Sequence, residues 1–341
     1  MLTHRKTFYP LSENLRRALR LFGRHSEIPS VYDDLLRFQN AIPYEDPSGQ
    51  ETLWLTVGYD QEMMRSLRPK LTYIYAMLKI GGDQTLAEHL TVERIDFGEF
   101  GNSRPFRIRI TNQFNGNSDY YYVKHADASR IFGLELEHLL SPNRISYLVK
   151  GNTLIEEHIA GVPGNVFLEE YLPRPELNRV RIAKEFTKFS ERCFIRLLGD
   201  MRSVNYVVDV TPDFEEVQYR VRAIDFDQQS YEGKTKVYQS FRFASNRDVV
   251  RMSFQELNRR TIRQYVEEER SQMARRARAE IRRLTSLISV MRKEHLAPQG
   301  HFLMLQDQLS ELHGSTAFTS AKTMGDLTAT HIRLILEPKS F

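Results

Sequence analysis

Two short stretches dominate the sequence: residues 198–209 read LGDMRSVNYVVD, and residues 223–227 read AIDFD. Asp200 is followed five residues later by Asn205, and Asp225 lies in the second stretch. ATP-dependent phosphoryl transfer needs a carboxylate where the attacking hydroxyl arrives. It also needs an amide oxygen and a second carboxylate for the Mg²⁺ that neutralises the triphosphate. The residue types, their order and their spacing therefore predict a phosphoryl-transfer site.

The residues between the two stretches predict a β-hairpin. Residues 206–210 are β-branched or aromatic, and residues 217–224 alternate between apolar and polar side chains. Thr211-Pro212-Asp213 is a turn signal between them. Pairing the two strands would bring Asn205 close to Asp225. The spacing of the two stretches therefore has a structural explanation.

These motifs resemble those of the protein-kinase-like superfamily, and in particular its small-molecule branch of aminoglycoside phosphotransferases and choline kinases. In that branch the catalytic loop has the sequence His-Gly-Asp-x-x-x-x-Asn, and the metal motif is Ile-Asp-Phe or Ile-Asp-Trp. Gly199-Asp200 with Asn205 matches the first motif, and Ile224-Asp225-Phe226 matches the second. Leu198 and Asp227 depart from the family pattern.

The resemblance implies a role for each matched residue. Asp200 would be the catalytic base, Asn205 a metal ligand and Asp225 the principal Mg²⁺ ligand. The alternative is a surface loop in which the Asp, Asn and Ser side chains form Asx-turns.

A lysine upstream matches the position of the family's phosphate-binding lysine. Residues 120–124 form a predicted strand that ends in Lys124, and they follow another predicted strand, 106–110, across a turn at 115–117. In kinase-like folds the third strand carries a lysine that pairs with the α- and β-phosphates, so the resemblance implies this role for Lys124. The alternative is a solvated lysine at a strand end.

The next segment predicts a partner for this lysine. Residues 127–140 have apolar side chains at helical spacing, and Glu135 falls on the apolar face while Glu137 lies nearer its edge. A carboxylate on a buried face needs a cationic partner, so we expect Glu135 to hold Lys124. The alternative is that both glutamates are solvated.

Two further segments are assigned through the resemblance to parts of the nucleotide site. Residues 154–161 resemble the kinase hinge, in which the backbone carbonyl of Glu157 and the amide of Ile159 would bind adenine. Gly98 and Gly101 lie between two predicted strands and would let backbone amides approach the phosphates. A plain hairpin turn is the alternative for these glycines.

The predicted fold class is α+β, a two-lobed protein-kinase-like fold with a helical N-terminal extension and long C-terminal helices. The extension covers residues 1–90. A β-rich, nucleotide-binding N-lobe covers residues 91–160. A helical C-lobe with the catalytic and metal-binding loops covers residues 161–341.

The composition agrees with a soluble enzyme, which we expect in the cytoplasm. The chain has 341 residues, of which 41% are hydrophobic and 27% charged, which is enough for a two-lobed core. A single cysteine, Cys193, excludes a disulfide within the chain. The first residues lack the apolar core of a signal peptide, and no run of about 18 apolar residues predicts a membrane span.

Together, the motifs predict an ATP- and Mg²⁺-dependent phosphotransferase that acts on a hydroxyl of a small-molecule acceptor. The first alternative is a pseudokinase, a nucleotide-binding or scaffold module without turnover. A second is a nucleic-acid-binding protein built on the arginine-rich segment 275–283. The formal net charge of only +4 disfavours this second alternative.

Overall fold

The structure is a computed structural model, and it divides the chain into two compact units. The first contains Met1–Asp127 and Ile145–His158, and the second contains Ala128–Arg144 and Ile159–Phe341. The residues that the structure describes are 6–25, 31–46, 49–79, 88–100, 102–213 and 217–336.

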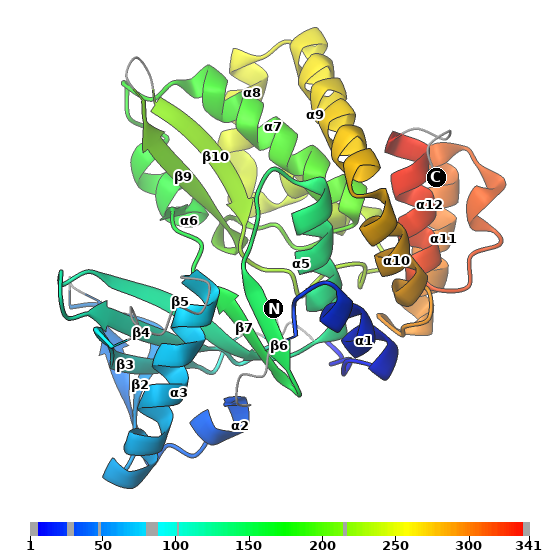
Figure 1. The fold of residues 1–341 in the computed structure, drawn as a ribbon. Helices are drawn as coiled ribbons and strands as arrows, with labels where there is room; N and C mark the ends of the chain where they lie inside the picture. The colour runs from blue at the N-terminus through cyan, green and yellow to red at the C-terminus, as the bar shows by residue number, and fades with distance from the viewer. Residues whose placement is uncertain are drawn as a thin grey trace. The chain divides into compact units, whose positions relative to one another are not determined.

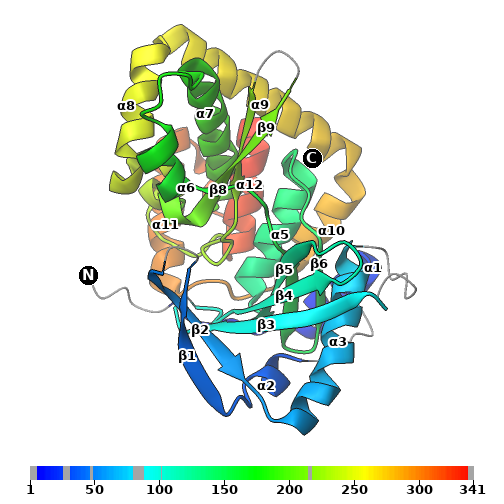
Figure 2. The same cartoon turned by 90° about the vertical axis from the view of Figure 1, so that its left-hand side faces the viewer.

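The first unit is built on a seven-stranded antiparallel sheet in the order β1-β2-β3-β4-β5-β7-β6. Its strands are β1 (Asn40–Glu45), β2 (Glu51–Gly58), β3 (Leu90–Gly98), β4 (Phe106–Asn112), β5 (Ser118–His125), β6 (Tyr147–Lys150) and β7 (Thr153–Glu157). Its described helices are α1 (Glu13–Leu21), α2 (Tyr32–Leu35) and α3 (Gln61–Lys79). Strands β1 to β5 follow one another across the sheet, and α3 lies along one of its faces (Figures 1 and 2).

The core of this unit lies between α3 and the sheet. Leu67, Leu71 and Ile74 recur at helical spacing, so they share one face of α3, and all three are buried. Alternate residues of a strand point to the same face of a sheet, and the sheet contributes Ile108 and Tyr121 to this core. The Tyr121 hydroxyl donates a hydrogen bond to the Leu71 carbonyl at 3.0 Å, which satisfies the one polar atom that this ring buries.

The expectation that residues 1–90 form a helical extension is wrong in part. Strands β1 and β2 form an antiparallel hairpin, and β2 pairs with β3 through Trp54 and Gly98, so this segment belongs to the sheet. The physical reason lies in residues 51–57, Glu-Thr-Leu-Trp-Leu-Thr-Val, which are mainly β-branched, aromatic or aliphatic. Residue 90 is therefore not a boundary between two parts of the chain.

The second unit is mainly helical and contains a three-stranded antiparallel sheet in the order β10-β9-β8. Its strands are β8 (Val162–Pro163), β9 (Tyr206–Pro212) and β10 (Val217–Ala223). Its α-helices are α5 (Ala128–Leu140), α6 (Gly164–Val166), α7 (Arg179–Arg196), α8 (Arg247–Glu256), α9 (Arg259–Ala279), α10 (Ile281–Met291), α11 (Gln299–His313) and α12 (Met324–Leu336). A π-helical turn follows α6 at Phe167–Tyr171, and 3₁₀ turns lie at Ser203–Asn205, Thr235–Tyr238, Ser240–Arg242, Ala244–Asn246 and Thr316–Phe318.

Helix α7 lies at the centre of this unit and packs against α8, α9 and β10 (Figure 1). The Asn178 side chain caps its N-terminus by accepting from the Arg181 amide, and Leu197 ends it in a left-handed conformation. Helix α5 is buried around almost its whole circumference and packs on α7, α9 and α10. This burial places α5 in the second unit, whereas the sequence analysis included it in a lobe of residues 91–160.

The mixed α+β class and the long C-terminal helices are confirmed. Helix α9 alone has 21 residues. Among the helices that the structure describes, none combines the length and the apolar character needed to cross a lipid bilayer.

Candidate functional site

The predicted hairpin is present and has the expected effect. Strands β9 and β10 pair antiparallel, with Tyr206 opposite Ala223 (Figure 1). The Ile224 amide donates to the Asn205 carbonyl at 3.0 Å, which extends the pairing by one residue. The residue that precedes β9 and the segment that follows β10 therefore leave the sheet side by side. The two sequence motifs meet at this end of the hairpin.

Asp200 lies in a tight loop after α7. Its φ of 59° places a non-glycine residue in the left-handed region, which Asp tolerates better than most residues but at some cost in free energy. The surrounding structure holds it there, because its amide donates to the Val237 carbonyl at 3.1 Å. Backbone conformations of this kind are often found at functional sites.

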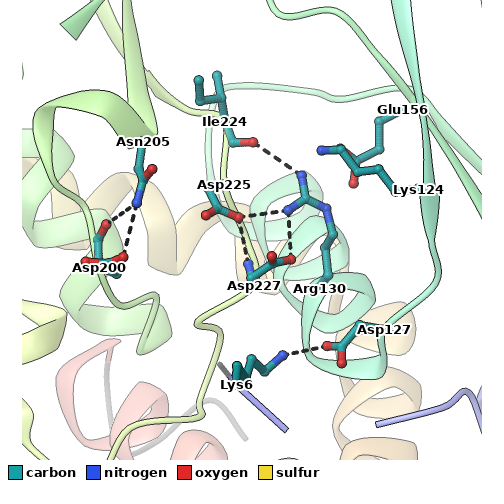
Figure 3. A network of polar contacts seen from close by, with 10 residues as sticks. All are labelled: Lys6, Lys124, Asp127, Arg130, Glu156, Asp200, Asn205, Ile224, Asp225 and Asp227. Atoms are coloured by element: carbon teal, nitrogen blue, oxygen red, sulfur yellow. Dashed lines mark hydrogen bonds and ion pairs between the residues drawn. The ribbon is translucent and has the colours of Figure 1, made fainter. Parts of the chain in front are cut away.

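Two side chains hold the Asp200 carboxylate. Arg202 donates from Nε and Nη2 to its two oxygens, each at 2.8 Å, in a bidentate pair. The Nδ2 of Asn205 donates to the Asp200 carbonyl at 2.7 Å and to its carboxylate at 3.3 Å (Figure 3). Arg202 was not among the site residues predicted from the sequence. Its position two residues after the predicted base, in a matched motif, was the signal available.

A buried arginine binds the loop that carries the predicted metal ligand. Nη1 of Arg130 lies 2.8 Å from Oδ1 of Asp225 and 2.9 Å from Oδ1 of Asp227, and Nη2 donates to the Ile224 carbonyl at 3.3 Å (Figure 3). Sequence reasoning missed this arginine. The departure from the family pattern at Asp227 was noted, but nothing in the sequence connects that residue to helix α5.

An Asx-turn, the alternative to a functional role for the matched residues, does occur in the Asp225 loop. The Asp227 amide donates to Oδ1 of Asp225 at 3.1 Å, which is the i to i+2 bond of such a turn. At Asp200, by contrast, the donors to the carboxylate are the side chains of Arg202 and Asn205. The turn at Asp225 fixes the direction of its carboxylate, so it is compatible with a binding role.

The donor set at the end of the hairpin fits Mg²⁺ by its chemistry. Asp225 offers a carboxylate on a side chain that is 33% exposed. The amide nitrogen of Asn205 is used by Asp200, which leaves its oxygen to bind a metal. Mg²⁺ prefers such oxygen ligands, needs only one or two from the protein and keeps several waters. Within the described ranges, no cluster of three or more Asp, Glu, His or Cys side chains is arranged as a metal site.

In the first unit, Lys124 forms an ion pair with Glu156. The two side chains lie 2.6 Å apart, and both are buried, so the alternative of a solvated lysine is wrong (Figure 3). Pairing of β5 with β7 places Lys124 opposite Leu154 and Tyr122 opposite Glu156, which makes the ion pair a diagonal contact across two strands. The role of Lys124 toward phosphates stays a prediction.

In the second unit, Glu135 is buried as expected from its place on the apolar face, so the alternative of two solvated glutamates is wrong. Arg283 of α10 donates to its carboxylate at 2.7 Å. Glu137 is buried as well and binds Arg196. A pair between Lys124 and Glu135 would join the two units, and it stays a prediction.

The hinge and glycine assignments have different outcomes. Strand β7 ends at Glu157, whose amide donates to the Ser146 carbonyl at 3.0 Å, and the adenine contacts of Glu157 and Ile159 stay predictions. The Gly98 amide donates to the Pro105 carbonyl at 2.8 Å and closes the hairpin between β3 and β4. In this arrangement that amide offers no hydrogen to a phosphate. For Gly98 the alternative, a plain hairpin turn, is therefore the correct interpretation. Gly101 lies outside the described residues.

Two arginines of the arginine-rich segment lie close to glutamates within the second unit. In the arginine-rich segment 275–283, Arg283 binds Glu135 and Arg276 lies 3.9 Å from Glu269. The side chains of this segment therefore do not all face a partner molecule.

Cys193 on α7 is buried, and burial raises the pKa of its thiol to about 11, which keeps the thiol protonated at neutral pH.

Comparison with known proteins leaves the geometry as the basis for a functional conclusion. No protein-family model matches the chain, and no curated protein matches it. The site consists of a carboxylate loop, an adjoining carboxylate pair and a hairpin that brings them together.

Proposed function

We propose that the protein is an ATP- and Mg²⁺-dependent phosphotransferase with a two-lobed protein-kinase-like fold, which transfers the γ-phosphoryl group to a hydroxyl of a small-molecule acceptor. One observation carries this proposal. The backbone hydrogen bond from Ile224 to Asn205 brings the Asp200 loop beside the Asp225 segment. Two motifs recognised separately in the sequence thus meet at one end of one hairpin, in the order that phosphoryl transfer requires.

Each residue then has a definable task. Asp200 accepts or orients the proton of the attacking hydroxyl, and Arg202 and Asn205 hold its carboxylate in place until the acceptor arrives. Asn205 and Asp225 would hold Mg²⁺, which supplies positive charge against the phosphate oxygens. Lys124 would neutralise the α- and β-phosphates, and Glu156 keeps its ammonium in position before nucleotide binds.

A second candidate, a pseudokinase that binds nucleotide without turnover, is favoured by one feature. Oδ1 of Asp225 already accepts from Arg130 and from the Asp227 amide. A cation from the protein itself thus lies at the carboxylate where an active enzyme would place Mg²⁺. The phosphotransferase proposal is preferred because Asp200, Asn205, Asp225 and Lys124 are all present in the required order.

The Asp225→Asn variant tests the proposal. ATP should bind the unaltered protein more tightly when Mg²⁺ is added, and the variant should lose most of that gain, because a neutral amide holds Mg²⁺ less well than a carboxylate. Titration calorimetry with ATP, with and without Mg²⁺, measures both affinities, and circular dichroism verifies folding. The matched control is Asp248→Asn, at an exposed carboxylate on α8 of the same unit. Equal, metal-independent ATP affinity in the unaltered and Asp225→Asn proteins would rule out Asp225 as a ligand of nucleotide-bound Mg²⁺.

A further inference from the structure

We infer that Arg130 is a positioning residue that serves as an internal counter-cation: it holds the Asp225–Asp227 loop in place without metal and competes with Mg²⁺ for that loop. The inference rests on the proposed function in that Asp225 is taken as the metal ligand. It goes beyond that proposal by assigning a role to Arg130 and to Asp227, neither of which belongs to the matched motifs.

The geometry places one cation between two carboxylates. A single guanidinium nitrogen, Nη1, lies within 2.9 Å of an oxygen of Asp225 and an oxygen of Asp227. The second nitrogen, Nη2, binds the Ile224 carbonyl. The guanidinium thus contacts every residue of the segment 224–227 except Phe226. Figure 3 shows these contacts converging from α5 on the segment that follows β10. An arginine in this position fixes the course of the whole loop.

Burial makes the contact a lasting one. The Arg130 side chain is 2% exposed, and a guanidinium stays protonated at any physiological pH. A charge removed from water in this way needs opposite charge at hydrogen-bond distance, which the two aspartates supply. In return, Arg130 offsets the repulsion between two carboxylates that lie two residues apart. Without a cation at this place, Asp225 and Asp227 would repel one another.

The same contact limits how a metal ion can bind. Oδ1 of Asp225 already accepts two hydrogen bonds, from Arg130 and from the Asp227 amide. A divalent ion that approaches this carboxylate also meets the positive charge of Arg130, which weakens its binding. Mg²⁺ alone should therefore bind poorly, and Mg²⁺ that arrives with a triphosphate should bind better, because the phosphate charges offset the repulsion.

The experiment measures Mg²⁺ binding without nucleotide. Thermal unfolding of the unaltered protein and of Arg130→Met is followed over a MgCl₂ titration at constant ionic strength. We expect Arg130→Met to unfold at a lower temperature without Mg²⁺ and to regain stability as Mg²⁺ is added, with a midpoint at roughly tenfold lower Mg²⁺ or less than in the unaltered protein. Adding Asp225→Asn to this variant should abolish the gain.

A matched control separates loss of a buried arginine from loss of this particular cation. Arg196 is equally buried in the same unit but binds one carboxylate, that of Glu137. Arg196→Met should lower the unfolding temperature without producing a response to Mg²⁺. Should Arg130→Met fail to fold, the neutral Arg130→Gln variant, which retains two donor hydrogens, replaces it with the same expected Mg²⁺ response.

Each outcome decides the inference. An equal Mg²⁺ response in the unaltered protein and the folded Arg130 variant would overturn it, and so would a response that survives Asp225→Asn. A response of the Arg130 variants at roughly tenfold lower Mg²⁺ or less than that of the unaltered protein supports it. Because no nucleotide is present, this result is independent of the proposed activity. Failure of the unaltered protein to bind Mg-ATP, with the Mg²⁺ response of Arg130→Met intact, would refute the proposed function alone.

Discussion

Two arginine–carboxylate pairs border the same hairpin, and their arginines differ in exposure to water. Arg202 is 46% exposed and Arg130 is 2% exposed, while their partners Asp200 and Asp225 are 25% and 33% exposed. Exposed pairs contribute little to stability and open readily. Breaking a buried pair leaves an uncompensated charge in the protein interior, which is costly. The comparison indicates that the Asp200 carboxylate can be released to an acceptor, while the Asp225 loop is held in place.

The strongest test of this comparison asks whether the exposed pair contains the reactive carboxylate. Asp200→Ala should lower turnover by roughly 10²–10⁴-fold and leave ATP affinity nearly unchanged, because a positioned base acts on the acceptor. Slow ATP hydrolysis serves as the readout, since water can take the place of the acceptor hydroxyl. Asp248→Ala is the control at an exposed aspartate on α8. Hydrolysis that persists undiminished in Asp200→Ala would argue against this residue as the base.

The second prediction concerns a pair in which both side chains are buried. Glu137→Gln leaves the Arg196 guanidinium buried without its carboxylate. The free energy of unfolding should fall by about 3–5 kcal/mol, the range for breaking a buried ion pair. Urea denaturation measures this change. A loss below about 1 kcal/mol would show that burial does not separate the two classes of pair.

The third prediction extends the comparison to a buried group that is neutral. His331 is fully buried between His313 and the Phe194 carbonyl, and burial lowers its pKa from 6.5 to about 3. Below about pH 6.5 the unfolded chain binds a proton that the folded protein excludes, so stability falls as the pH decreases toward 3. The slope from this residue is up to about 1.4 kcal/mol per pH unit.

The measurement compares the unaltered protein with His331→Gln, in which the side-chain amide can still donate to the Phe194 carbonyl. The unfolding free energy of both proteins is determined between pH 7 and pH 4. The variant should lose less stability over this range. Parallel pH profiles would show that His331 binds a proton equally in the folded and the unfolded state, so its burial does not lower its pKa.

The smallest effect is expected at the exposed pair itself. Arg202→Gln should change the free energy of unfolding by at most about 1 kcal/mol, because solvent already screens the pair. Chemical denaturation beside the Glu137→Gln variant measures the contrast directly. A loss comparable to that of Glu137→Gln would mean that the Arg202–Asp200 pair is structural, and the idea of a releasable carboxylate would fail.

Much of the local structure could be predicted because its causes are local. The alternation of residues 217–224 and the turn signal at 211–213 predicted the hairpin that brings Asn205 beside the Asp225 segment, although Thr211 and Pro212 are still paired within β9. The apolar spacing of residues 127–140 predicted helix α5 and the burial of Glu135, although this helix is buried on almost all sides. In both cases the pattern of side chains over a few residues reflects which face is buried.

The strands at 40–45 and 51–58 were not predicted, because the pairing that joins them to the sheet is not local in the sequence. The first pairs with the second, and the second pairs with β3, which begins more than 30 residues further along the chain. Strand preference depends strongly on what lies beside the strand, so a sequence window judges it less well than helix periodicity. Within the extension expected to be helical, residues 61–79 do form helix α3.

Ion-pair partners were decided by the tertiary structure. Arg130 and Asp225 are 95 residues apart in the chain, and Glu135 and Arg283 are 148 residues apart. A charged residue in a sequence carries no mark of which distant carboxylate will reach it, since that depends on how helices and strands pack. The order of the motifs is plain along the chain, and the hairpin between them and the helix within residues 127–140 could be predicted from short-range periodicity. Only the packing of distant segments decided that Arg130 binds the predicted metal ligand and that Arg202 holds the predicted base at the surface.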